Sequence, residues 1–95
     1  MEINIFNYTG DFAENKDVAH DLRVERIMPC LKKHEKVFLD FAGVRGATQS
    51  FVHALLSDAI RQYEYTFNFV YFKNCSPLVK EIVQTVAAYM QEGYE

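Results

Sequence analysis

The sequence predicts a single α/β domain, in which a small parallel or mixed sheet packs against helices. Two observations lead to this fold class. Short apolar, β-prone runs alternate with longer stretches of helical periodicity, in the order β-α-β-α-β-α. The chain has 95 residues, and neither a linker nor an internal repeat interrupts it. One domain over residues 1–95 is therefore expected, with right-handed crossovers between strands.

The first strand and the first helix are predicted in the N-terminal third of the chain. The segment EINIF, residues 2–6, is a short β-prone run. A helix is expected from near Asp17, because Asn15 or Asp17 can accept hydrogen bonds from the amides of a first turn. Pro29 lacks an amide N–H, so this helix is expected to end near Met28 or to kink there. Its predicted apolar face consists of Val24, Ile27, Met28 and Leu31.

The second strand and helix are predicted between residues 36 and 63. The run KVFLDF, residues 36–41, is so apolar that both of its faces are expected to be covered, as in a parallel sheet flanked by helices. The following helix is predicted to begin near Thr48. Its apolar positions keep helical spacing over three turns and are Val52, Leu55, Leu56, Ala59, Ile60 and Tyr63.

The last strand and helix complete the pattern. TFNFVYF, residues 66–72, is predicted to be a strand. One face of this strand would carry Phe67, Phe69 and Tyr71, and the other Val70 and Phe72. Ser76 is expected to cap the last helix, with Pro77 at its first position. The apolar face of this helix consists of Val79, Ile82, Val83, Val86 and Met90.

Composition and charge exclude several functions. The net charge of −3 argues against nucleic acid or anionic membrane as a partner, because phosphate-driven binding needs a concentrated positive patch. Residues 1–12 have no basic flank and no long apolar run, and no later stretch is long enough to span a bilayer, so a cytoplasmic location is expected. Cys30 and Cys75 lie far apart and are expected to be reduced thiols. No motif for a metal or a cofactor is found, and none is expected.

The loop before the second helix concentrates glycine and hydroxyl residues. It belongs to the segment DFAGVRGATQS, residues 40–50. In open α/β sheets, ligands and partners bind at the carboxyl ends of the strands, where this loop is expected to lie. Gly43 and Gly46 suit a sharp turn that needs positive φ. Thr48 and Ser50 lie at the partly positive end of the helix, so a phosphate on either hydroxyl would be stabilised and would alter a partner surface built here.

The same residues carry a resemblance to a known family. VFLDFAGVRGATQSFVHALL, residues 37–56, resembles the signature of STAS-like domains, which are small α/β modules related to bacterial anti-sigma factor antagonists. The family pattern is an apolar strand, Asp, an apolar residue, a small residue, Gly, Val, three variable positions, and a short acidic and hydroxyl-rich turn that opens an apolar helix. In this chain Thr48 stands where the antagonists have the acidic residue. FVYFKNCSPLVKEIV, residues 69–83, resembles the strand, polar turn and helix that follow. The resemblance covers most of the chain from Lys36 onward.

The resemblance implies a signalling module that switches between partners. Such an antagonist binds a histidine-kinase-like ATPase or an anti-sigma-type kinase, and phosphorylation of one hydroxyl releases it. In this chain Gln49 occupies the position of the phosphorylated serine, so that mechanism does not carry over directly. The closer resemblance is to the STAS-like branch of unassigned function, which implies a regulatory protein-binding domain without catalysis. The phosphoacceptor candidates are Ser50 and Thr48, and the partner-binding candidates are Arg45, Gly46, Gln49, Ser50 and His53.

Several of these residues also have structural explanations. Thr48 fits the N-cap of the helix. Asp40 is expected to be a buried carboxylate bonded to loop amides, which together with Gly43 would fix the shape of the loop. Arg45 fits a solvated loop position, and His53 fits a surface position near the loop.

Two other classes of function stay open. Cys30, Cys75, His20, His34 and His53 could supply a thiol and imidazole pair, but no local signature supports catalysis, and no catalytic residue is assigned. Aromatic residues make up 15% of the chain. If the helices cover only one face of the sheet, an aromatic second face would favour a homodimer with a structural or assembly role.

Overall fold

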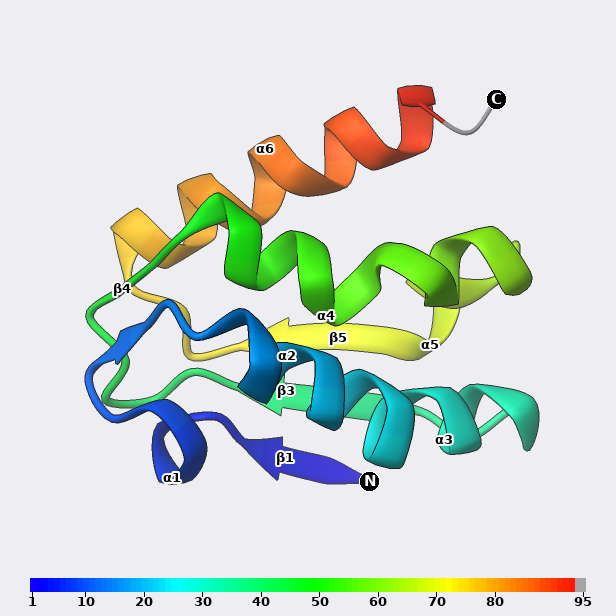
Figure 1. The fold of residues 1–95 in the computed structure, drawn as a ribbon, viewed down its shortest axis with the longest axis horizontal. Helices are drawn as coiled ribbons and strands as arrows, with labels where there is room; N and C mark the ends of the chain where they lie inside the picture. The colour runs from blue at the N-terminus through cyan, green and yellow to red at the C-terminus, as the bar shows by residue number, and fades with distance from the viewer. Residues whose placement is uncertain (94–95) are drawn as a thin grey trace.

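The computed structural model describes residues 1–93 as an α/β domain (Figure 1). Its main sheet is parallel throughout, has the strand order β1-β3-β5, and consists of β1 (Glu2–Asn4), β3 (Val37–Asp40) and β5 (Val70–Lys73). A second, two-stranded parallel sheet joins β2 (Phe12–Ala13) to β4 (Gly46–Ala47). The predicted fold class, a small sheet packed against helices, is confirmed.

The helices lie mainly in one layer beside the sheet. In the continuous helical stretch formed by α2, η1 and α3, α2 and η1 pack along α4, and α6 packs on the other side of α4 (Figure 1). The helical elements are α1 (Phe6–Thr9), α2 (Lys16–Leu22), the π-helical η1 (Arg23–Ile27), α3 (Met28–Lys32), α4 (Gln49–Gln62), α5 (Thr66–Phe69) and α6 (Pro77–Gly93). Within residues 1–93, no helix combines the length and apolarity needed to cross a membrane.

The two faces of the main sheet differ in burial. Ile3, Leu39 and Phe72 share one register line, and Ile3 and Leu39 are fully buried beneath the helices. On the other face, the rings of Phe38 and Tyr71 stack at 5.3 Å, and Lys73 pairs with Glu2 at 2.7 Å. The prediction that both faces of β3 are covered is therefore wrong within the described chain. Among the described residues, α2 and α6 both pack on α4, so these three helices form one layer.

The first helix begins as predicted but continues further. The Asn15 side chain accepts hydrogen bonds from the amides of Asp17 and Val18, which confirms the cap. The helical stretch passes Pro29 and ends only at Lys32. Directly before the proline, the amide of Met28 donates to the carbonyl of Arg23, five residues back, which is the π-type bond. This wider turn accommodates a proline that cannot donate to the preceding turn.

The π segment also changes which residues of this helix are buried. An extra residue in one turn breaks the 3.6-residue repeat on which the predicted apolar face depended. Ile27 and Leu31 are buried as predicted, but Val24 is 49% exposed, and Arg23 takes the inward position with 7% exposure. The assignment of Val24 to the apolar face is therefore wrong.

The third strand is shorter than predicted. Residues 66–69 form the helical turn α5, and β5 begins at Val70. The buried hydroxyl of Thr66 donates to the carbonyls of Ala59 and Tyr63, which holds the chain in a turn after α4. Val70 and Phe72 share one face of β5 as predicted. The placement of Phe67 and Phe69 on a strand face with Tyr71 is wrong.

The predicted apolar faces of the two long helices, α4 and α6, are confirmed. In α4 the buried positions are Phe51, Val52, Leu55, Leu56 and Ala59, with Ile60 and Tyr63 half-buried. The Ser76 hydroxyl accepts a hydrogen bond from the amide of Val79 at 3.2 Å, and Pro77 is the first residue of α6. The buried positions of α6 are Val79, Val83, Val86 and Met90, with Ile82 half-buried.

Candidate partner-binding surface

Asp40, the last residue of β3, joins two loops at the carboxyl edge of the sheet. One carboxylate oxygen accepts hydrogen bonds from the side-chain amide of Asn74 at 3.0 Å and from the backbone amide of Ala42 at 2.9 Å. The bond from Asn74, then the bond from Ala42, and more weakly the nearby Lys73 ammonium hold the pKa of Asp40 below its usual value. The predicted bond to a loop amide is confirmed. The predicted burial is wrong, because Asp40 lies on the sheet face that no helix covers and is half-exposed.

The two loop glycines are needed for different reasons. Gly43 has φ +84°, which confirms the predicted left-handed turn, and a Cβ there would lie 3.0 Å from the Phe6 ring. Gly46 does not have positive φ, so that part of the prediction is wrong. A Cβ on Gly46 would lie 2.9 Å from the Phe12 ring, so glycine there permits close approach of the ring. Gly46 is buried and therefore shapes the loop rather than exposing a side chain to a partner.

Two aromatic rings cover this loop and remain partly exposed to solvent. Phe6 of α1 is 43% exposed and lies over Gly43, and Phe12 of β2 is 47% exposed and lies over Gly46. Neither ring was predicted to be part of the site. The rings come from separate elements more than 30 residues before the loop, and no local pattern links those elements to it.

Arg45 lies at the tip of the loop, next to the start of α6. Its side chain is 84% exposed and forms an ion pair with Asp11 at 3.7 Å, which agrees with the predicted solvated position. The hydroxyl of Ser76 donates to the Arg45 carbonyl at 3.1 Å and brings the first turn of α6 to the loop. We call Phe6, Phe12, Arg45, Gln49 and Ser50 together the loop-edge surface, and all five are exposed.

The two candidate phosphoacceptors differ in accessibility. The Thr48 hydroxyl accepts a hydrogen bond from the amide of Phe51 at 3.0 Å, which confirms the predicted N-cap of α4. Thr48 is half-buried, whereas Ser50 is exposed in the first turn. Within residues 1–93 no hydrogen bond engages the Ser50 hydroxyl. Ser50 is therefore the more accessible acceptor.

A groove of about 650 Å³ adjoins the loop-edge surface, between α2, α4 and α6. Three of the predicted partner-binding residues, Gln49, Ser50 and His53, line it together, and His53 is exposed as predicted. Arg45 and Gly46 lie outside the groove. The remaining lining residues are Lys16, Asp17, His20, Arg23, Ala54, Ser57, Thr85, Val86 and Tyr89.

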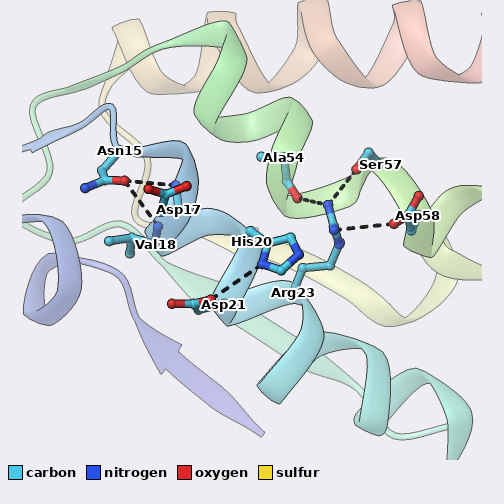
Figure 2. A network of polar contacts seen from close by, with 9 residues as sticks. All are labelled: Asn15, Asp17, Val18, His20, Asp21, Arg23, Ala54, Ser57 and Asp58. Carbon is cyan, nitrogen blue, oxygen red and sulfur yellow. Dashed lines mark hydrogen bonds and ion pairs between the residues drawn. The ribbon is translucent and has the colours of Figure 1, made fainter.

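Arg23 fixes one side of this groove to α4 (Figure 2). Its Nη1 donates to the Ala54 carbonyl at 2.7 Å and to the Ser57 hydroxyl at 2.6 Å, and Nη2 lies 3.4 Å from the Asp58 carboxylate. Its Nε is buried and has no hydrogen-bond partner within residues 1–93. Arg23 was not predicted to lie here, because charged residues are mostly exposed and the π segment that turns it inward has no sequence signal.

The thiols and imidazoles weighed as a catalytic pair lie in different places. Cys30 is buried near Met1, whereas Cys75 is half-buried after β5 and its pKa is raised, first by burial and then by the Asp40 charge. His20 and His53 line the groove, and His34 stacks on Tyr65 at 4.6 Å. No hydrogen bond joins either thiol to an imidazole within residues 1–93. In the same part of the chain, no three His, Cys, Asp or Glu side chains could hold a metal ion together.

These features define a small α/β domain with an exposed loop, two exposed rings and a groove at one edge of its sheet. Residues 19–80 match the family described as the STAS-like domain of unknown function (DUF4325), so the chain belongs to this family. The match runs from α2 into the first turn of α6 and includes the loop, α4 and β5. The resemblance found in the sequence is thereby confirmed. No curated protein and no solved structure matches the chain.

Proposed function

We propose that this chain is a non-catalytic regulatory module that binds a protein partner through the loop-edge surface and the adjoining groove. The observation that carries this proposal is the exposure of Phe6 and Phe12 directly over the loop glycines, together with the exposure of Ser50 in the first turn of α4. Exposed aromatic rings rimmed by polar residues are typical of protein interfaces, where aromatic side chains are enriched. Gln49, Ser50 and His53 extend this surface into the groove.

Phosphorylation of Ser50 would regulate this surface without unfolding the domain. A phosphoserine carries about −1.5 to −2 charges at neutral pH. At the N-terminus of α4 that charge interacts favourably with the helix dipole, so the fold tolerates it. A partner that covered the same surface would have to desolvate the phosphate, which weakens binding. Thr48 is the poorer acceptor, because its hydroxyl already caps α4.

The resemblance to anti-sigma factor antagonists suggests the class of partner. We propose a histidine-kinase-like ATPase or an anti-sigma-type kinase, with the interaction taking place in the cytoplasm. The family description names no activity, so this part of the proposal depends on the resemblance alone.

A pull-down with matched baits tests the proposed surface. Baits would carry the wild-type sequence, Ser50→Ala, Ser50→Asp, or Asn68→Asp, which adds the same charge at an exposed position in α5. We expect one protein to be recovered on wild type, Ser50→Ala and Asn68→Asp and to be reduced at least tenfold on Ser50→Asp. Equal recovery of the protein on all four baits would show that Ser50 is not part of the interface. Loss on both Asp variants would indicate a nonspecific charge effect.

A further inference from the structure

The outer edge of β5 leaves backbone hydrogen-bonding groups unused. β5 is the last strand in the order β1-β3-β5, so no strand lies beyond it in the described chain. The amide of Phe41 donates to the Lys73 carbonyl at 2.9 Å, which shows that the backbone groups of Lys73 face β3. Because these directions alternate along a strand, the N–H and C=O of Phe72 point away from β3. No hydrogen bond within residues 1–93 occupies them.

A groove of about 500 Å³ runs along this free edge. Val70 and Phe72 line it from β5, Cys75 from the turn after β5, and Lys80, Val83 and Gln84 from α6. In Figure 1, β5 is the strand of the main sheet that lies nearest to α6. α6 packs mainly against α4, so the space beside the edge of β5 stays open.

The chemistry of the groove selects one kind of occupant. Free backbone groups at a sheet edge pair with another extended backbone, which is the arrangement of strand addition. Val70 and Val83 offer buried apolar contact. Lys80 is exposed, is the one charged residue that lines the groove, and forms no ion pair within residues 1–93. A carboxylate on the incoming segment would complement it.

A second copy of this chain fits the groove less well. Two β5 edges paired with each other would bring two Lys80 ammonium groups to one interface, and the residues that line the groove supply no carboxylate. Like charges brought together at an interface oppose association. The charge therefore favours a different protein over self-pairing.

We propose that the β5 edge and its groove bind an extended segment of a partner protein as an added strand, with apolar side chains toward Val83 and an acidic residue toward Lys80. β5 has four residues, which matches about 13 Å of strand, so the added segment needs only four or five residues. The lining residues of this groove include none of the five residues of the loop-edge surface, and the proposed strand addition does not depend on Ser50.

Selection from a phage library of random dodecapeptides tests the proposal. The bait is the full chain, with counter-selection on Val83→Arg, which fills the groove. Enriched peptides would be synthesised, and their binding to the full chain would be followed by amide hydrogen exchange and by the labelling rate of Cys75. Cys30 is buried, so labelling reports mainly on Cys75. We expect an acidic residue within an apolar, extended motif. Bound peptide should protect the Phe72 amide and slow Cys75 labelling at least tenfold, while the Tyr71 and Lys73 amides, which already face β3, change little.

Charge-reversal variants keep the test independent of whether Val83→Arg folds. Lys80→Glu should weaken the selected peptides at least tenfold, whereas Lys33→Glu, at an exposed site just after α3, should leave the affinity unchanged. The proposal is overturned if no peptide is enriched over the counter-selection, or if bound peptides leave both the Phe72 amide and Cys75 unaffected. It is also overturned if the chain dimerises and protects both groups without peptide.

Discussion

The side of α4 that faces the sheet differs sharply from the side that faces solvent. On the inner side, Phe51, Leu55 and Leu56 are fully buried in the core. On the outer side, Gln49, Ser50 and His53 are exposed along the groove. Stability and the proposed recognition are therefore assigned to different residues of the same helix. Substitutions on the inner side should lower the free energy of unfolding, whereas substitutions on the outer side should change binding alone.

Leu55→Ala should have the largest effect. Truncation of a fully buried leucine removes apolar contacts and leaves a cavity, so the free energy of unfolding should fall by about 2–5 kcal/mol. Urea denaturation measures this change. His53→Ala, on the exposed side of the same helix, is the control and should stay within about 0.5 kcal/mol of wild type. Similar losses in the two variants would contradict the division between the two sides.

Gly43→Ala should have the next largest effect, because it tests the loop that joins β3 to α4. A left-handed backbone costs a residue with a Cβ about 1–2 kcal/mol, and here the Cβ would also press on the Phe6 ring at 3.0 Å. The matched control is the same substitution made in a Phe6→Ala background, because the positive φ of Gly43 stays and the ring that the added Cβ would meet is removed. Thermal or urea unfolding should show the greater loss for Gly43→Ala in the wild-type background. An equal loss of unfolding free energy in the two backgrounds would mean that the Phe6 ring moves aside without destabilising the fold.

Thr48→Ala tests the residue at the boundary between the two sides of α4. Loss of the hydroxyl that accepts from the Phe51 amide should lower the free energy of unfolding by about 1 kcal/mol. Thr48→Ser keeps the acceptor and should recover most of this loss. If Thr48→Ala instead abolished partner binding at unchanged stability, Thr48 would belong to the recognition surface.

The pH dependence of unfolding tests the link between the two edge loops. The folded-state pKa of Asp40 is depressed, first by the hydrogen bond from Asn74, so the ionised form stabilises the fold. This contribution is present above the unfolded pKa of about 3.9 and is lost as pH falls through the lower folded value. Urea unfolding between pH 2 and pH 6 should therefore show a steeper acid loss for wild type than for Asp40→Asn. Identical pH profiles would show that the Asp40 bonds do not stabilise the loop.

Ser50→Asp should have the smallest effect on stability. Ser50 is exposed in the first turn of α4, and its hydroxyl forms no hydrogen bond to the part of the chain that the structure describes, so the free energy of unfolding should stay within about 0.5 kcal/mol of wild type. The helix dipole would favour the added charge slightly. Thermal unfolding checks this expectation, and a loss above 1 kcal/mol would show that Ser50 contributes to the fold.

The accuracy of the sequence predictions depended on how local their signals were. The helices α4 and α6 were predicted well, because a cap and a regular apolar face both lie within each segment. Val24 was misplaced because the π segment shifts the periodicity by one residue. The strand predicted from Thr66 begins only at Val70, because the Thr66 hydroxyl donates to the carbonyls of Ala59 and Tyr63, bonds that only the folded chain can form.

The candidate site shows the same limit. The loop, the Thr48 cap and the position of Ser50 at the start of α4 could be predicted from the residues between Asp40 and Ser50. Phe6, Phe12 and Arg23 were not, since each reaches the site through the packing of elements distant in sequence. Long-range packing of this kind leaves no pattern in a single chain.

The central claim is that a partner covers the loop-edge surface and that phosphate on Ser50 releases it. The most direct test is a pull-down of this protein from its native cell extract with and without ATP, with phosphosites and bound proteins both identified by mass spectrometry. We expect an ATPase-like partner to be bound without ATP and to be lost as phosphate appears on Ser50. A partner that stays bound when Ser50 is phosphorylated, or the absence of any partner that Ser50→Asp displaces, would contradict this account.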